Sequence, residues 1–170
     1  QIGGGPPTTL PPGGRLYLQP EARWVVHERE GEVELRHLPD NHVVPVPPSI
    51  APPLMAVEFG GGHVLLVART RAELFDLGSG QPGQPLLAVD AVEGHRFSSA
   101  ALYRRGVDGV PWVALGELAV RVPQMALPNA PEPNANAIVR AVDRTGLVVA
   151  RWTFDVADWR HVAGLPKATA

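Results

Sequence analysis

Two stretches of the chain follow one pattern at an offset of 39 residues, and this repeat constrains the fold more than any other feature. Residues 24–38 (WVVHEREGEVELRHL) place an apolar run before the turn-forming pair Glu30-Gly31, after which apolar and charged residues alternate. Residues 63–77 (HVLLVARTRAELFDL) follow the same course around a polar Arg-Thr-Arg turn, with Glu73 where the first copy has Glu34. Alternation with period two predicts half-buried strands, so each stretch is expected to form two strands joined by a turn.

A third copy is expected in residues 111–122 (PWVALGELAVRV), where Val113-Ala114 falls on Val67-Ala68 and Val120 falls on Leu74, at an offset of 46. A further short apolar strand is expected before each of the three copies, at 15–18, 54–59 and 99–104. Another is expected after each of the first two copies, at 42–46 and 85–89. Residues 137–156 supply two longer strands as an incomplete last unit. A period of about 40–45 residues with four strands per unit is typical of propeller blades, which must stack to bury their faces.

The repeat therefore predicts an all-β fold, a β-propeller-like array of about four four-stranded antiparallel units. The alternative is a β-sandwich with long Pro-rich loops. The 18 glycines and 19 prolines among 170 residues argue against long helices. In this reading LFDLGSGQPGQPL (74–86) is the end of a third strand and the turn into a fourth. The expected domain plan has a flexible Gly/Pro-rich arm (1–14), a single β-rich domain (15–160) and a C-terminal tail (161–170). The four units of the domain are expected at 15–46, 54–89, 98–122 and 137–156.

Composition removes several classes of function. The net charge of −2 gives no electrostatic reason to bind nucleic acid. The chain has no cysteine, which excludes disulfides, thiolate metal sites and cysteine catalysis. The longest apolar stretch, 43–57, is interrupted by five prolines and cannot form a membrane-spanning helix. A chain that starts at Gln1 is expected to be processed, trimmed or excised from something longer, and the sequence assigns no compartment.

The middle of the chain resembles a known family. Residues 72–89 (AELFDLGSGQPGQPLLAV) resemble the blade end of bacterial WD-type repeats, with Phe75-Asp76 at the position of the Trp-Asp pair. Gly94-His95 resembles the Gly-His pair of that family, and residues 98–113 resemble the start of the next blade. The resemblance is clearest over residues 54–122, and a quinoprotein-like propeller shows similar patterns. It implies a degenerate WD40-like propeller that acts as a binding scaffold.

No motif for catalysis, cofactor binding or metal binding emerges. His37 and His42 flank a turn containing Asp40, but a zinc site needs three or four converging ligands. The serines near His95 lack a triad frame. The acids Glu28, Glu30, Glu32 and Glu34 alternate along one region and predict a solvated face. The sequence thus predicts no catalytic residue, no metal and no cofactor.

The first hypothesis for function is a non-catalytic protein-interaction or scaffolding module of propeller type, alone or as part of a larger propeller or complex. The turns that carry Arg29 and the pair Arg69 and Arg71 are expected on one common face, where these arginines would contact an acidic patch of a protein partner. Another chain, or self-association, would complete the fold. The alternatives are a structural assembly protein with lacing arms, or a hydrolase whose site lies in the propeller channel or in a partner chain.

Overall fold

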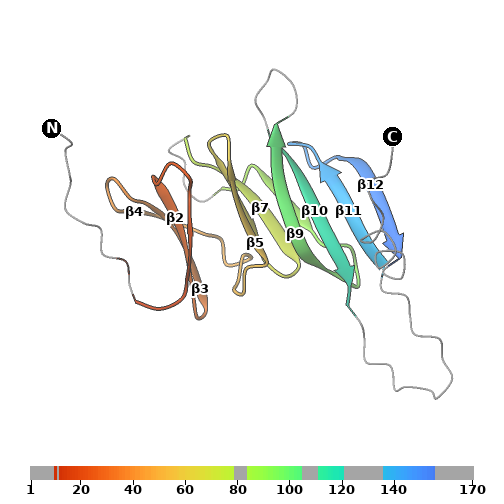
Figure 1. The fold of residues 1–170 in the computed structure, drawn as a ribbon, viewed down its shortest axis with the longest axis horizontal. Helices are drawn as coiled ribbons and strands as arrows, with labels where there is room; N and C mark the ends of the chain where they lie inside the picture. The colour runs from red at the N-terminus through yellow and green to blue at the C-terminus, as the bar shows by residue number, and fades with distance from the viewer. Residues whose placement is uncertain (1–9, 11, 79–83, 105–110, 121–135, 156–170) are drawn as a thin grey trace, which may run out of the picture.

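The computed structural model describes residues 10, 12–78, 84–104, 111–120 and 136–155 (Figure 1). These residues form twelve strands in three four-stranded sheets, and the described part of the chain contains no helix. The prediction of an all-β fold made of four-stranded antiparallel units is confirmed. Within the same residues, no helix is long and apolar enough to cross a membrane.

Each sheet is a meander in which every strand pairs antiparallel with the strand before it. The strands of sheet A are β1 (Arg15–Leu18), β2 (Trp24–Arg29), β3 (Glu32–His37) and β4 (His42–Pro45). The strands of sheet B are β5 (Ala56–Gly60), β6 (His63–Val67), β7 (Arg71–Asp76) and β8 (Leu87–Asp90). The strands of sheet C are β9 (His95–Arg104), β10 (Pro111–Ala119), β11 (Asn136–Val142) and β12 (Val148–Asp155).

Sheets A and B share part of their strand spacing at an offset of 39 residues. Strands β3 and β7 occupy equivalent six-residue spans at that offset, and β2 and β6 begin at equivalent positions. Gly31 supplies the positive φ of 80° in the β2–β3 turn. The stretch 74–86 contains the end of β7 and leads into β8, as the repeat predicts.

The third and fourth sequence units belong to one sheet. Residues 111–122 were expected to contain two strands, but β10 is one strand that continues through this region. It pairs with β9 on one side and with β11 on the other, so residues 98–122 and 137–156 contribute to the same sheet. The described residues therefore form three sheets where the repeat counted about four units.

Sheet B lies in the middle and packs on both of its faces. Leu65 and Val67 of β6 point into a core shared with Phe97 and Leu115 of sheet C. The alternate residues of the same strand, including Leu66, point into a core shared with sheet A. Because successive side chains of a strand face opposite sides, one fully apolar strand can serve two cores. This three-layer stack differs from a two-sheet sandwich.

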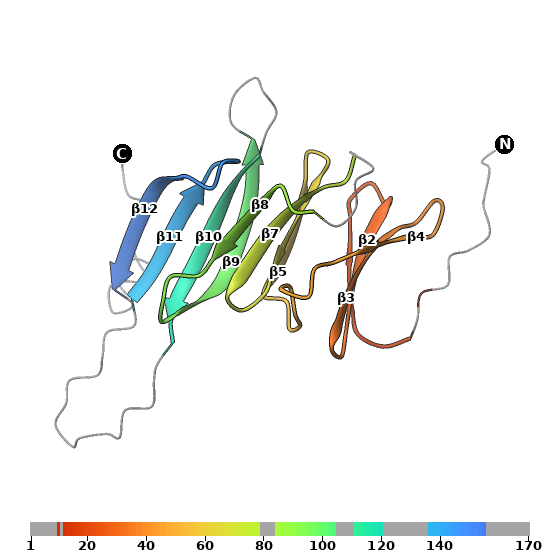
Figure 2. The same cartoon turned by 180° about the vertical axis from the view of Figure 1, so that it is seen from behind.

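The three sheets are arranged in a row. Sheets A and C lie at the two ends of the molecule, with β4 and β12 toward opposite ends (Figures 1 and 2). Figure 2, the view from behind, shows β8 of the middle sheet in front. The first strands of sheets B and C, β5 and β9, contact each other. Leu87 and Val89 of β8 lie in the same core as Val142 of β11, so sheets B and C also pack away from their first strands.

Candidate functional site: connector contacts and outer sheet faces

Glu117 of β10 is the most strongly bound buried charge at the contact between sheets B and C. The residue is 1% exposed, and Arg140 of β11 donates to its carboxylate from Nε at 2.7 Å and from Nη2 at 2.8 Å. The backbone N–H of Val92, in the connector between the two sheets, donates to Oε1 at 2.8 Å. Arg140 also donates to the carbonyl of Asp90, 2.7 Å away. A two-point arginine–carboxylate pair is a strong contact, and here it fixes the connector to sheet C.

The connector between sheets A and B is held by two further buried glutamates, one from each sheet. The backbone N–H of Leu54 donates to Glu28 of β2 at 3.1 Å. The hydroxyl of Ser49 donates to Glu73 of β7 at 2.8 Å. Glu28 is 7% exposed and Glu73 is 1% exposed, so both carboxylates serve the packing of neighbouring sheets. The prediction that Glu28 belongs to a solvated face is wrong, because its side chain turns toward sheet B.

Two of the three arginines predicted to contact a partner are paired within the chain. Arg71 donates to Asp90 at 2.9 Å and to Glu73 at 3.0 Å, and these carboxylates raise the pKa of the Arg71 guanidinium. Arg29 lies 3.4 Å from Glu32 and also approaches the carboxylate of the next acid along β3. The side chains of Arg71 and Arg29 are about one-third exposed.

Arg69 is exposed, and its carbonyl accepts a hydrogen bond from the backbone N–H of Phe97. The turn that carries Arg69 thus lies beside the connector from sheet B to sheet C. The β2–β3 turn lies equivalently beside the connector from sheet A to sheet B, where residues 29–31 share a pocket with Pro52 and Pro53. The two turns therefore occupy matching positions. Recognition of an acidic partner by these arginines stays a prediction.

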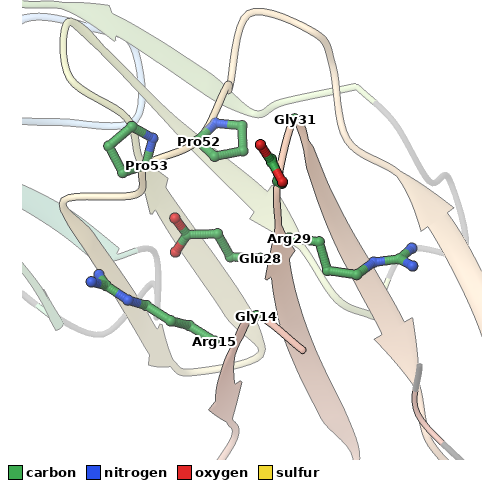
Figure 3. A pocket seen from close by; sticks show the side chains of 8 residues that line it. Gly14, Arg15, Glu28, Arg29, Gly31, Pro52 and Pro53 are labelled. Carbon is green, nitrogen blue, oxygen red and sulfur yellow. The ribbon is translucent and has the colours of Figure 1, made fainter. Parts of the chain in front are cut away.

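The pocket beside the β2–β3 turn has a volume of about 410 Å³ (Figure 3). Figure 3 shows Glu28 pointing toward the segment of Pro52 and Pro53, while Arg29 points the opposite way. The carboxylate of Glu28 already accepts hydrogen bonds from Leu54 and from the hydroxyl of Tyr17. Burial and this contact with Glu28 raise the pKa of Tyr17. The buried charge of the pocket is thus engaged in holding the sheet contact.

Sheet C turns an apolar face away from sheet B. Along β10, the partly exposed Trp112, Ala114 and Leu118 alternate with the buried residues that face sheet B. The registers with β9, β11 and β12 align four alanines across this outer face: Ala101, Ala114, Ala141 and Ala150. Ala101 is exposed, Ala114 and Ala150 are half-buried, and Ala141 is already buried at 2% exposed. No described strand lies against this face (Figures 1 and 2).

Sheet A turns a mixed face away from sheet B. Its exposed apolar side chains are Leu16 and Leu18, which are 54% and 58% exposed, and Val43 of β4. The face also carries a charged cluster, in which Arg36 donates to Glu34 at 3.1 Å and Arg29 lies 3.6 Å from the same carboxylate. None of the described strands packs on this side of the sheet (Figures 1 and 2). Single exposed apolar residues are ordinary, but a contiguous apolar face such as the outer face of sheet C is typical of an interaction surface.

The histidines do not assemble a catalytic or metal site in the described residues. His37 contacts Asp40 at 2.7 Å, and Asp40 also accepts a hydrogen bond from the backbone N–H of His42, so the segment forms a bonded turn. These two contacts lower the pKa of Asp40. His95 contacts the carbonyl of Glu93 at 3.1 Å. No group of three metal-ligating side chains occurs in this part of the chain.

The buried His27 and the connector contacts of Glu73 and Glu117 were not predicted from the sequence. The imidazole of His27 is 0% exposed and lies 2.7 Å from the carbonyl of Gly13. The one available signal was an acid inside an apolar strand, as in VALGELA, where Glu117 interrupts the alternation. Its partner Arg140 lies beyond a segment outside the described residues.

A scan against protein-family models and searches of curated proteins and solved structures found no match.

Proposed function

We propose that the chain is a non-catalytic protein-interaction module of propeller type, which binds protein through the outer faces of its two end sheets. The observation that carries the proposal is that the three sheets differ in how many of their faces are covered by another sheet. Sheet B is covered on both faces, while the described strands cover sheets A and C on one face each. A four-stranded sheet with two apolar faces needs a neighbour on each side to remove them from water.

The buried charges support a structural role for the interior. Glu28, Glu73 and Glu117 all accept hydrogen bonds from connector atoms, and Glu73 and Glu117 also pair with arginines. Catalytic acids are typically poised at an open cleft with a free proton position. The propeller assignment rests on four-stranded meanders stacked in a row and on the WD-type pattern around Phe75-Asp76.

A photo-reactive amino acid placed at single positions tests the proposal. Position 101 lies on the outer face of sheet C and position 18 on the outer face of sheet A. Position 147 is the matched control, because Leu147 is 63% exposed in the β11–β12 turn and lies on neither face. Irradiation in cell extract should give protein adducts from positions 101 and 18 well above those from position 147. Equal adduct yields at the three positions would contradict the proposal.

A further inference from the structure

We propose that two copies of this chain close into one ring of six sheets, in which the outer face of sheet C of each copy packs on the outer face of sheet A of the other. This proposal rests on the proposed function, because it names the partner for those two faces. It extends to a second copy the contact that already joins sheet A to sheet B and sheet B to sheet C within one chain.

The repeat shows that the sheets follow one another in the same orientation. At the offset of 39, Leu35 of sheet A corresponds to Leu74 of sheet B, and each side chain faces the following sheet. Val25 corresponds to Val64, which faces the preceding sheet. The outer face of sheet A is therefore the counterpart of the face of sheet B that receives sheet A. Sheet A is built to receive a preceding sheet.

The outer face of sheet C corresponds to the faces of sheets A and B that pack on the next sheet along the chain. Val113 and Leu115 of β10 face sheet B, so the alternate residues Trp112 and Ala114 point onward. A contact between sheet C and sheet A of another copy would join these two kinds of face. It would be a head-to-tail contact of the kind that sheets A, B and C already form inside the chain.

The chemistry of the two faces fits such a contact. The exposed Leu16, Leu18 and Val43 of sheet A would meet the alanine row and Trp112 of sheet C, which adds apolar burial on both sides. Arg29 and Arg36 of this face both lie within ion-pair distance of Glu34, so their charges would enter the contact as ion pairs. An apolar face opposite neutral charge pairs leaves no unmatched charge buried in the contact.

The number of sheets in one chain fits half of a ring. Strands β5 and β9 contact each other, and β4 and β12 lie toward opposite ends of the molecule (Figures 1 and 2). Head-to-tail contacts produce a closed ring when the rotation between units closes. Closed propellers have typically four to eight blades, so the three sheets of one chain fall short and the six of two chains lie within the range.

Light scattering on purified chains tests the proposal. The wild-type chain should have twice the mass of one chain, which is 18.1 kDa. Leu18→Glu on sheet A and Ala101→Glu on sheet C should each reduce the mass to that of one chain, because a buried carboxylate would damage both contacts of the ring. Leu147→Glu should keep the wild-type mass. Ser99→Glu, at another exposed position on the outer face of sheet C, is the second variant, and circular dichroism verifies folding.

A mixture of the two variants distinguishes this ring from other dimers. One copy with Leu18→Glu and one with Ala101→Glu retain one undamaged contact between them, so mixing should raise the mass toward two chains. A mixture that stays at one chain would overturn the proposal. So would an Ala101→Glu variant that dimerises by itself, because its dimer would form without the outer face of sheet C. A single-chain mass for the wild type would also overturn it. If the wild type has the mass of one chain, photo-adducts from position 101 to another protein would still support the proposed interaction module. No such adducts would contradict both the ring and the interaction module.

Discussion

At the scale of single residues, the molecule uses buried carboxylates to fix its connectors. Glu117 receives three hydrogen bonds, two from Arg140 and one from the backbone of Val92, with both side chains nearly removed from water. Breaking such a pair leaves one charge buried without a partner, which costs more than the intact pair contributes. The contact between sheets B and C should therefore depend strongly on this one pair.

We expect Glu117→Gln to lower the free energy of unfolding by about 3–5 kcal/mol, because it leaves the Arg140 guanidinium without its counter-charge. Arg140→Met in the same chain should recover part of this loss. Glu32→Gln is the control, since the side chain of Glu32 is 70% exposed and its pair with Arg29 is worth less than about 1 kcal/mol. Urea unfolding at one fixed chain concentration measures all three. Equal losses for Glu117→Gln and Glu32→Gln would contradict the assignment.

Asp143 makes the stability of the β11–β12 turn depend on pH. The hydroxyl of Thr145 donates to Oδ1 of Asp143 at 2.6 Å, and backbone N–H groups of Thr145 and Leu147 add to it. These hydrogen bonds, the first above all, lower the pKa of Asp143 below its usual value of 3.8. A group with a lowered folded pKa stabilises the fold above the unfolded pKa, and this contribution is lost as the pH falls through the folded pKa.

We therefore expect Asp143→Asn to lose stability less steeply than the wild type as the pH falls below about 4. Above that pH the wild type keeps the full contribution of the ionised Asp143. The measurement is the unfolding midpoint in urea between neutral and acidic pH for both proteins. Parallel curves through the acidic range would show that Asp143 has the same pKa in the folded and unfolded chains.

At the scale of elements, the strands of sheets A and B could be predicted because their turns and their alternation agree. Gly31 marks the β2–β3 turn, and the offset of 39 carries the same pattern to β7. Sheet C could not be divided correctly, because Gly116 interrupts an apolar run in the same way that a turn would. In the structure the strand continues through Gly116, where a Cβ would overlap the side chain of Ser99, and β9 absorbs the irregularity as a register shift.

The candidate surfaces were less accessible to sequence reasoning than the strands. That the turns of Arg29 and Arg69 lie on one common face stays a prediction, and the pairing of Arg71 with Asp90 depends on a strand register. The burial of Glu28 similarly depends on a neighbouring sheet that approaches from a different part of the chain. Local patterns reveal which residues alternate, whereas the identity of the covered face is decided by packing between sheets.

Two adjacent leucines of β6 allow the two cores of the middle sheet to be tested separately. Leu65 packs in the core with sheet C and Leu66 in the core with sheet A. Either change to alanine should lower the free energy of unfolding by about 2–5 kcal/mol, because each side chain is fully buried. The strands in which amide hydrogen exchange becomes faster should differ between the two variants. Leu65→Ala should speed exchange in β9 and β10, and Leu66→Ala in β2 and β3. The same exchange pattern in both variants would contradict the assignment of faces.

At the scale of the whole molecule, three stacked sheets leave two outer faces that match the faces buried inside the stack in their orientation. Sheet A presents a receiving face and sheet C presents an onward face, so the same contact that builds the chain internally can join it to another copy. Such a contact would close the row of sheets into a ring, and it would remove the exposed apolar side chains of both outer faces from water.

The native mass of the wild-type chain in solution, measured by light scattering over a wide range of concentrations, tests this account most directly. The account predicts a species of twice the 18.1 kDa of one chain that unfolds cooperatively, with a midpoint that rises with concentration. A cooperatively folded species that keeps the mass of one chain at every concentration would contradict it.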